Sequence, residues 1–386
     1  MYSSNPLCFD GLRLRVDDLA ASPRLFVWRE RVDENLLRMR TLLESIAPGT
    51  GFHHLRPHAK TCKSSWTIQR QMAAGITKFK ASPNELSLLL SSGVRDIVLS
   101  YPPLPSTAEA IAQALRDFRS RGEPLRLIAQ AGAPEHIEFL STAAREHGVQ
   151  IECLLDLDVG MGRTGAAPDC AVSLYQRLNA EASLRFAGLH VYDGHNHSAV
   201  EATRTAESAR SMSLVAGAAR LIRAAGGAVP LVVAAGSPAF LPDLRALLAA
   251  APESEIEVSP GTWIYWDTNY DRLMPGMFRF AALILARVMD RPGKDRVTLD
   301  LGHKRWAIDS GPIERFSVND LEVIKASEEH TVLKTGGAAR ALLIGDPVLF
   351  VPRHICSTVN LWEEFSIVGP TGEIELPHCP VDGRNR

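Results

Sequence analysis

Ten residues of the chain, LRPHAKTCKS over 55–64, combine an arginine, a histidine, two lysines and a cysteine. A lysine at the end of a strand can form a Schiff base with a carbonyl compound, and Lys60 has that position here. Pro57 excludes a regular helix, and the alternation before Lys60 favours a short strand that ends at this lysine. A solvated basic loop is the alternative, and on composition alone it is the commoner outcome.

A second stretch, DLDVGMGRTG over 156–165, places Arg163 among three glycines directly after a candidate strand. A guanidinium in that position can donate hydrogen bonds to an anionic oxygen of a ligand. The alternative is a tight turn that holds a structural ion pair between an aspartate and Arg163.

The stretch YDGHNH follows another candidate strand and supplies Tyr192, His195 and His197. Two histidines on one short loop favour general acid–base chemistry, and the residues do not decide between the two. Tyr192 is either part of the same site or a core residue whose hydroxyl is satisfied.

Two turns of small residues follow the last two candidate strands. The first contains Gly236 and Ser237, and the second contains Gly261 and Thr262. Backbone N–H groups and hydroxyls in such turns bind phosphate at the mouths of barrels. Either turn alone is a weak indication, but the pair predicts a phosphorylated ligand.

His354 and Cys356 stand two residues apart far along the chain. On an extended backbone, residues i and i+2 project to the same side. One imidazole and one thiolate so placed can share a borderline metal such as zinc. A half-buried strand with a chance cysteine is the alternative.

The elements that must position these side chains follow from the apolar pattern. Helical spacing from Val32 to Ile46 predicts a first helix. Eight candidate strands then alternate with helical segments over about 210 residues, which is the size of one (β/α)8 barrel with its chemistry at the strand ends. The strands are His53–Ala59, Thr77–Ala81, Asp96–Ser100, Leu125–Ala129, Val149–Leu157, Leu184–Tyr192, Leu231–Ala234 and Glu255–Val258, and the helical segments include Glu85–Ser92, Ala108–Phe118, Glu135–His147, Pro168–Leu178, Ala202–Ala225 and Leu241–Leu248.

After about Gly276 the pattern becomes β-rich, with no good helix. We therefore predict a barrel domain over residues 29–272 and a β domain over 1–28 and 273–386, joined by an N-terminal strand at Ser22–Trp28. The strands expected in the second domain are Phe278–Met289, Arg296–Leu301, Leu321–Ala326, Ala341–Val351 and Glu364–Val368.

Composition excludes several classes of protein. The chain has 386 residues and a net charge of -2, so no basic field suggests a nucleic acid or an anionic membrane as partner. No apolar run approaches the roughly 20 residues that span a bilayer, and Met1–Asp10 has no secretory pattern, so we expect a cytoplasmic protein. The six scattered cysteines are then expected to be free thiols or ligands.

Taken together, these motifs resemble the fold-type III pyridoxal-phosphate enzymes, and more narrowly the D-threonine aldolase and D-serine dehydratase family. The resemblance covers roughly residues 22–375 and implies a (β/α)8 TIM barrel of the alanine racemase type followed by an all-β domain. It implies that Lys60 carries the cofactor as a Schiff base, that Arg163 lies near the phenolic oxygen and that Tyr192 lies by the pyridine nitrogen. The residues that it assigns to the cofactor phosphate are Gly236, Ser237, Gly261 and Thr262.

The resemblance also implies a divalent metal on His354 and Cys356, with zinc favoured over manganese or magnesium. The family's D-S-G stretch corresponds to Asp309–Gly311. The chain departs from the family at Cys62, where a histidine is usual, and at Trp28, where an acid is usual. These departures leave the cofactor in place and put the substrate in doubt.

The resemblance implies that the protein is a lyase acting on small D-β-hydroxy amino acids. By analogy with related barrels, it also implies a homodimer. The thiolate ligand favours the dehydratase branch, which is therefore the first expectation and converts D-serine or 3-hydroxy-D-aspartate to a keto acid and ammonia. The histidine-rich loop favours the aldolase branch, which releases glycine and an aldehyde. An amino-acid racemase and a non-catalytic protein that binds pyridoxal phosphate are the other classes left open, although the β-rich second half argues against the latter.

Overall fold

The computed structural model describes residues 6–15, 21–234, 236–336 and 342–384. These form two compact units. The barrel unit consists of Arg40–Lys60 and Ile68–Gly261, and the β unit consists of Met1–Met39, Thr61–Thr67 and Thr262–Arg386. The chain thus passes between the units four times, at Met39–Arg40, Lys60–Thr61, Thr67–Ile68 and Gly261–Thr262.

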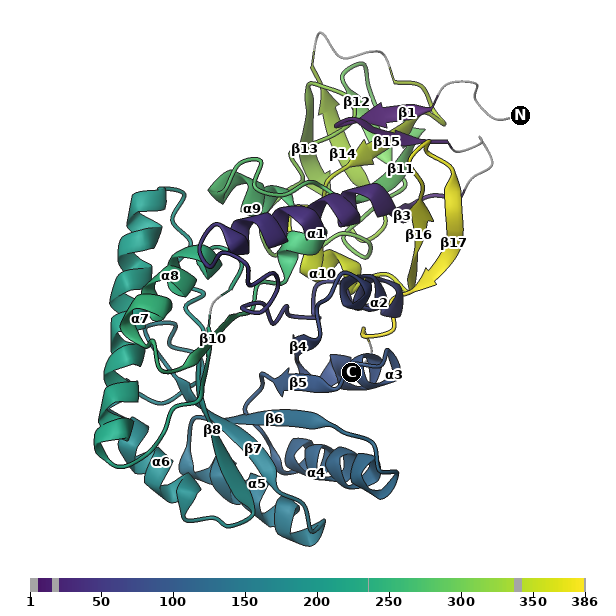
Figure 1. Cartoon of the computed structure of the whole chain (residues 1–386). Helices are drawn as coiled ribbons and strands as arrows, with labels where there is room; N and C mark the ends of the chain where they lie inside the picture. Colours follow the sequence, from purple (N-terminus) through teal and green to yellow (C-terminus); the bar gives the residue numbers. More distant parts are fainter. Residues whose placement is uncertain (1–5, 16–20, 235, 337–341, 385–386) are drawn as a thin grey trace. The chain divides into compact units, whose positions relative to one another are not determined.

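Seven parallel strands form the sheet of the barrel unit, and each strand pairs with the next one along the chain (Figure 1). Single bridges join Leu55 to Val258 in the last strand and His58 to Lys80 in the first, so the segment before Lys60 lies between the two edges. The strand predicted at His53–Ala59 is reduced to these bridges because Pro57 has no N–H to donate. The strands are β4 (Lys78–Ala81), β5 (Asp96–Leu99), β6 (Arg126–Ala131), β7 (Ile151–Leu157), β8 (Leu184–Val191), β9 (Leu231–Ala234) and β10 (Glu255–Val258).

Helices follow the strands in alternation and lie on the outside of the sheet (Figure 1). Their apolar faces bury residues such as Ile111, Leu140 and Leu244. The (β/α)8 prediction is therefore confirmed. The helices are α3 (Leu86–Ser91), α4 (Pro105–Ser120), α5 (Pro134–Glu146), α6 (Ala171–Asn179), α7 (Glu201–Ala224) and α8 (Phe240–Ala250), with short 3-10 turns at Pro83–Glu85 and Pro168–Cys170.

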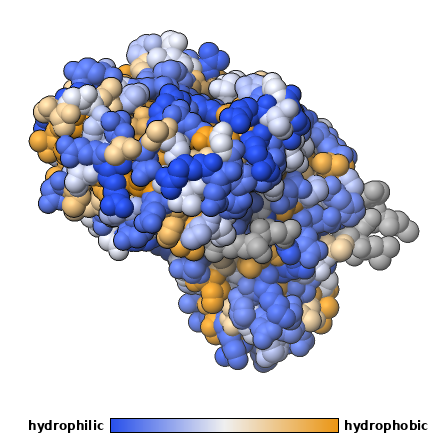
Figure 2. All heavy atoms as spheres, turned by 90° about the horizontal axis from the view of Figure 1, so that it is seen from below, coloured by the Kyte–Doolittle hydropathy of each residue, from blue (hydrophilic) through white to orange (hydrophobic). Residues whose placement is uncertain are grey.

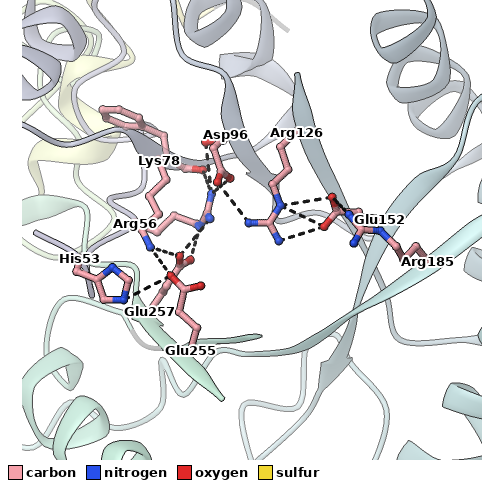
Figure 3. A network of polar contacts seen from close by, with 10 residues as sticks. His53, Arg56, Lys78, Asp96, Arg126, Glu152, Arg185, Glu255 and Glu257 are labelled. Atoms are coloured by element: carbon pink, nitrogen blue, oxygen red, sulfur yellow. Dashed lines mark hydrogen bonds and ion pairs between the residues drawn. The ribbon is translucent and has the colours of Figure 1, made fainter. Parts of the chain in front are cut away.

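Side chains on one face of the strands form three layers inside the barrel unit, because alternate residues of a strand share a face. Where the strands begin, buried Arg56 pairs with Glu257 and Asp96, and Arg126 pairs with Glu152 (Figure 3). Two residues further along, an apolar cluster follows: Val98, Ile128, Leu154, Ala187, Leu231 and Val233. Near the strand ends, polar side chains return: Lys80, Gln130, Asp156 and His190 are buried there, with Ser100 just beyond β5.

Gly188 is the point where β8 passes too close to β9 for any side chain. A Cβ at this position would lie 1.9 Å from the carbonyl oxygen of Leu231, and φ is +135°. The register of β7 against β8 shifts just before this glycine. The close approach brings His190 and Tyr192 to the strand-end mouth of the unit in their observed register.

The main sheet of the β unit is almost entirely antiparallel and includes the N-terminal strand β3 (Arg24–Trp28). β3 pairs antiparallel with β11 (Ala282–Asp290) and parallel with β16 (Glu364–Val368). The remaining strands of this unit are β12 (Arg296–Leu299), β13 (Leu321–Ala326), β14 (Thr331–Thr335), β15 (Pro347–Phe350) and β17 (Ile374–Pro380), with a separate hairpin of β1 (Leu7–Phe9) and β2 (Leu12–Leu14).

Two expectations for this part of the chain are corrected. The predicted strand Ala341–Val351 is shortened to β15, and its first residue lies outside the described residues. The expectation of no helix is wrong, because α10 (Ile355–Val359) forms one short helix. The other helices are α1 (Arg29–Glu44), α2 (Ser65–Ala73) and α9 (Thr268–Leu273), with a 3-10 turn at Thr262–Ile264.

The surface has no large apolar region on the face shown in Figure 2, where hydrophilic residues predominate and apolar ones occur in small separate groups. Among the described residues, no helix is long and apolar enough to cross a membrane. All six cysteines lie in the described part of the chain, and none of them forms a disulfide, as expected.

Candidate active site

Three residues predicted from separate motifs meet around one aromatic ring in the barrel unit. The Nζ of Lys60 lies 6.0 Å from the centre of the Tyr192 ring, and the guanidinium of Arg163 lies 4.8 Å from it. Lys60 and Arg163 are exposed and Tyr192 is half-buried. Two cations over the negative face of one ring make a pocket suited to an anionic, planar ligand.

Glycines fix the place of the Tyr192 ring. A Cβ on Gly194 would lie 2.3 Å from the Cε1 of Tyr192, and one on Gly236 would lie 2.8 Å from its Cε2. Gly236 is one of the predicted phosphate residues, and next to it the hydroxyl of Ser237 accepts a hydrogen bond from the N–H of Gly261 at 3.2 Å. The two predicted turns therefore meet within the barrel unit. Thr262, the fourth predicted residue, belongs to the β unit.

The loop that carries Arg163 is closed by Asp158. One carboxylate oxygen, Oδ1, accepts hydrogen bonds from the N–H groups of Gly160 at 2.9 Å and Gly162 at 3.1 Å. Burial alone would raise the pKa of Asp158, but these N–H groups outweigh it and hold the pKa below its ordinary value. Asp158 therefore pairs with backbone N–H groups of its own loop rather than with Arg163, so the guanidinium is available to a ligand.

The structure distinguishes the two candidate histidines. A Cβ on Gly160 would lie only 3.2 Å from the Nε2 of His195, so the imidazole rests on the glycine loop. The Nδ1 of His195 is buried and has no hydrogen-bond partner within the part of the chain that is described. His197 is exposed and contributes its backbone N–H to the carbonyl of His195. Of the two, His195 is the one beside the predicted cofactor residues.

A buried group that the sequence interpretation missed lies directly below this mouth. The Nζ of Lys80 is 2.7 Å from the Nε2 of His190, and the Nδ1 of His190 is 2.6 Å from the Oδ1 of Asp156. All three side chains are almost completely buried. The spacing of two from Lys78 places Lys80 on the same face of β4, but only the closed barrel shows that this face points inward.

The loop of His195 is anchored by a buried pair of acids, Asp193 and Asp243. Burial raises the pKa of both, and the neighbouring Asp193 carboxylate raises that of Asp243 further. Two ionised carboxylates would leave their buried oxygens without donors, whereas a proton on Asp243 supplies one. We therefore expect Asp243 to be the protonated member.

Replacing Asp243 by asparagine should make the protein more stable at alkaline pH. A raised carboxyl pKa means that the unfolded chain ionises first, so stability is lost as pH rises above the ordinary aspartate pKa of about 4. Asp243→Asn cannot ionise and avoids that loss. At pH 8 we expect a midpoint of thermal unfolding higher by about 2–4 °C, and at pH 4 little difference from the wild type. A variant that is less stable at both values would contradict the shared proton.

The predicted metal pair lies in the β unit, but not on a strand. His354 is the extended residue before α10, and Cys356 lies in the first turn of that helix. The prediction of an extended His-x-Cys segment is therefore wrong. The two side chains still lie close enough to form a hydrogen bond. Burial would lower the pKa of His354, but Cys356 and Asp309 outweigh it and raise the pKa to about 9.

Further side chains surround this pair. The Nδ1 of His354 is 2.6 Å from the Oδ2 of Asp309, a contact that leaves Nε2 for a metal, as in carboxylate–histidine–metal sites. The hydroxyls of Thr61 and Thr262 lie 3.0 and 3.5 Å from the Sγ of Cys356. Among the described residues, no group of three or more His, Cys, Asp or Glu is placed to hold a metal ion.

Cys62, which stands where the D-threonine aldolase and D-serine dehydratase family usually has a histidine, is a buried packing residue. It is buried in the β unit near Tyr265, whose hydroxyl bonds to that of Thr67 at 2.6 Å. Trp28, where an acid is usual, is likewise buried, and its Nε1 donates to the carbonyl of Arg13 at 2.8 Å. Both departures therefore serve packing within this unit.

The donors at the barrel mouth fit pyridoxal phosphate. Lys60 offers an amine for the aldehyde, and Arg163 offers a guanidinium for the phenolic oxygen. The glycine turn against Tyr192 leaves backbone open to a phosphate, and the buried hydroxyl of Ser259 has no partner within the described residues. An amine, a guanidinium and a hydroxyl-lined turn are the groups that this cofactor needs.

Comparison with known proteins agrees with this geometry. Residues 56–268 match the family described as "Alanine racemase, N-terminal domain". The chain belongs to this family. Residues 281–368, which follow the racemase-type domain, match the "Putative serine dehydratase domain". Two domains in this order confirm the resemblance to the D-threonine aldolase and D-serine dehydratase family, and with it the expectation of a pyridoxal-phosphate-dependent lyase.

Individual members of the family are similar over most of the chain. D-threonine aldolase of Arthrobacter sp is 27% identical, over 81% of this chain and 81% of that protein. The crystal structure of D-threonine aldolase from Filomicrobium marinum matches with a TM-score of 0.84 at 28% identity, over 95% and 96% of the two chains. D-threo-3-hydroxyaspartate dehydratase from Delftia sp. HT23 shares the fold, with a TM-score of 0.79 at 21% identity over 94% and 98%.

Proposed function

We propose that this chain cleaves the Cα–Cβ bond of small D-β-hydroxy amino acids, releasing glycine and an aldehyde, with pyridoxal phosphate and a divalent metal as cofactors. The observation that carries the reaction type is the position of His195 against Gly160, beside the loop of Arg163. The similarity to two D-threonine aldolases supports the same branch.

The residues that would hold the cofactor are those gathered at the barrel mouth. Lys60 would bind its aldehyde, Arg163 its phenolic oxygen, and the turns at Gly236–Ser237 and Gly261–Thr262 its phosphate. Tyr192 is a phenol, so it would face the pyridine nitrogen without protonating it. When bound, pyridoxal phosphate supplies the electron sink for bond cleavage at Cα.

His195 is the proposed general base for the substrate β-hydroxyl. Its imidazole is fixed from below by Gly160, and the loop of that glycine is held by Asp158. A neutral imidazole so placed can take the hydroxyl proton as an aldehyde forms. His354 and Cys356, with Asp309 orienting the imidazole, would hold a metal that supplies Lewis-acid chemistry to that hydroxyl.

Dehydration to a keto acid and ammonia is the second candidate, and Cys356 favours it. The thiolate ligand was the reason that the sequence interpretation placed this branch first. In that reaction Lys60 would remove the α-proton, and the substrate would lose its hydroxyl rather than its side chain. We nevertheless place cleavage first, and the position of His195 supports this order, because a base for the hydroxyl serves cleavage rather than dehydration.

A product assay on D-threonine, D-serine and 3-hydroxy-D-aspartate, with and without EDTA, tests the proposal. We expect glycine and an aldehyde, both lost with EDTA. His195→Ala should lose roughly 10²–10⁴-fold in kcat, whereas the matched variant His197→Ala should stay within a few-fold of wild type.

Each other result identifies a competing function. Ammonia as the main product would establish the dehydratase. Racemisation that survives EDTA would establish a racemase, which needs no metal. An absorbance band of bound cofactor, with no turnover of any of the three substrates, would indicate a non-catalytic protein that binds pyridoxal phosphate.

A further inference from the structure

The segment that follows Lys60 is buried although it forms neither a helix nor a strand. Residues 61–64 lie between Lys60 and α2, and each of them is 6% exposed or less. Irregular segments usually run over the surface, because buried N–H and C=O groups need hydrogen-bond partners. The partners of residues 61–64 therefore decide how the backbone after Lys60 is held.

The last residues of the chain supply several of these partners within the β unit. After β17 the chain passes the start of α2 (Figure 1). The N–H of Gly383 donates to the carbonyl of Lys63 at 2.9 Å, and the Nζ of Lys63 donates to the carbonyl of Gly383 at 3.3 Å. The Sγ of Cys379 lies 3.5 Å from the Oγ of Ser64. Residues 379–384 are called the C-terminal clamp below.

Asp382 joins the C-terminal clamp to the first turn of α2. Its Oδ2 accepts a hydrogen bond at 3.0 Å from the N–H of Ser65, the first residue of that helix. The first N–H groups of a helix have no partner within the helix, and a carboxylate there also meets the positive end of the helix dipole. A side chain 317 residues away in sequence thus does what a local N-cap does in other helices.

Lys63 has a backbone conformation that needs such support. Its φ is +48°, in the left-handed region that residues with a side chain rarely adopt. A conformation of this kind persists where the surrounding contacts over-determine it. Both hydrogen bonds with Gly383 are made by this residue, so the C-terminal clamp holds the turn through which the chain passes from Lys60 into α2.

We propose that the C-terminal clamp fixes the backbone that carries Lys60, so that residues at the far end of the chain set how firmly the protein holds its cofactor. The inference rests on the proposed function, since it assumes that Lys60 is the cofactor lysine. Asp382 acts through Ser65 and residues 61–64, and it is a positioning residue rather than a catalytic one. Without it, part of the binding free energy of the cofactor would be spent on ordering this segment.

The first test measures amide hydrogen exchange in the protein without cofactor. The N–H groups of Ser65 and Gly383 should exchange slowly in the wild type, because both are bonded in the C-terminal clamp. In Asp382→Ala, a peptide that covers residues 61–67 should exchange about 5-fold faster, which is the effect of losing one helix cap. Fast exchange of both amides in the wild type would overturn the proposal, and so would an unchanged peptide in the variant.

The second test titrates the cofactor-free protein with pyridoxal phosphate and obtains the Kd from the visible band. Asp382→Ala should raise this Kd about 5-fold, while the band still forms at saturation because Lys60 is intact. Asp382→Asn keeps an acceptor oxygen and should stay within about 2-fold of the wild type. Arg384→Ala is the matched control and should keep the wild-type Kd, because its guanidinium pairs with Glu363 at 3.5 Å.

A wild-type Kd in Asp382→Ala would overturn the proposal, and a lower midpoint of thermal unfolding in that variant would then show that Asp382 only stabilises the fold. Asp382→Asn binding as weakly as Asp382→Ala would also overturn it. If Asp382→Ala does not fold, exchange of the Ser65 amide in the wild type decides. A wild type that takes up no pyridoxal phosphate would reject the proposed function, and hydrogen exchange would still show whether the C-terminal clamp holds residues 61–64.

Discussion

Replacing Lys60 by alanine should abolish the visible band of bound pyridoxal phosphate and lower turnover by on the order of 10⁴-fold or more, the scale on which loss of a covalent nucleophile acts. Lys60 is an exposed amine whose Nζ lies 6.0 Å from the centre of the Tyr192 ring, and alanine has no amine to form the Schiff base. The measurement is an absorbance spectrum after dialysis against cofactor-free buffer, followed by a product assay.

Lys63→Ala is the matched control, since it removes the other lysine of the same ten-residue stretch. Lys63 is buried in the β unit, where its Nζ donates to the carbonyl of Gly383 at 3.3 Å. That variant should keep the band even if it loses some stability. A band that survives dialysis in Lys60→Ala would show that another amine anchors the cofactor.

Replacing Arg56 by methionine should cost about 3–5 kcal/mol of the free energy of unfolding. Arg56 is fully buried and bonds to Glu257, which is 1% exposed at its side chain, and to Asp96 at 2.7 Å (Figure 3). Without the guanidinium, the buried Glu257 loses one of its two cationic partners among the described residues and keeps the ion pair with Lys78. Unfolding in urea measures the loss of unfolding free energy, with the wild type and the variant compared at a common dependence of that free energy on urea concentration.

Arg126→Met provides the comparison, because Arg126 is in the same network but its side chain is 38% exposed. It should cost about 1 kcal/mol or less, as exposed ion pairs do. Equal losses of unfolding free energy in the two variants would mean that burial does not decide how much an ion pair of this network contributes to stability.

The sequence predicts the barrel well because its signal is local. Alternation and turn residues define β5, β9 and β10 to within a residue, and the reactive motifs stand where those strands end. The β unit is harder to predict because its short elements, such as the five-residue α10, carry too few residues for a period to appear. His354 and Cys356 were found as a pair by type, while their backbone geometry was not.

The residues of the site also differ in how far the sequence predicts them. Lys60, Arg163 and Tyr192 come from separate motifs that share strand ends, so topology alone brings them together. The choice of His195 over His197 depends on a contact with Gly160 that no local pattern contains. Lys80 was overlooked because a lysine next to Phe79 and Ala81 suggests a surface residue, and only the closed barrel turns its side chain inward.

The pairing of β3 with β11 and β16 has a consequence for how the protein is made. The strand leaves the ribosome early, whereas its two partners follow only after the whole of the barrel unit has been synthesised. During translation β3 therefore remains an apolar strand without its partners. The residues that form the barrel unit can fold before β11 and β16 cover β3. A chain that stops before β16 would leave that edge open, and we expect such fragments to aggregate rather than accumulate as folded barrels.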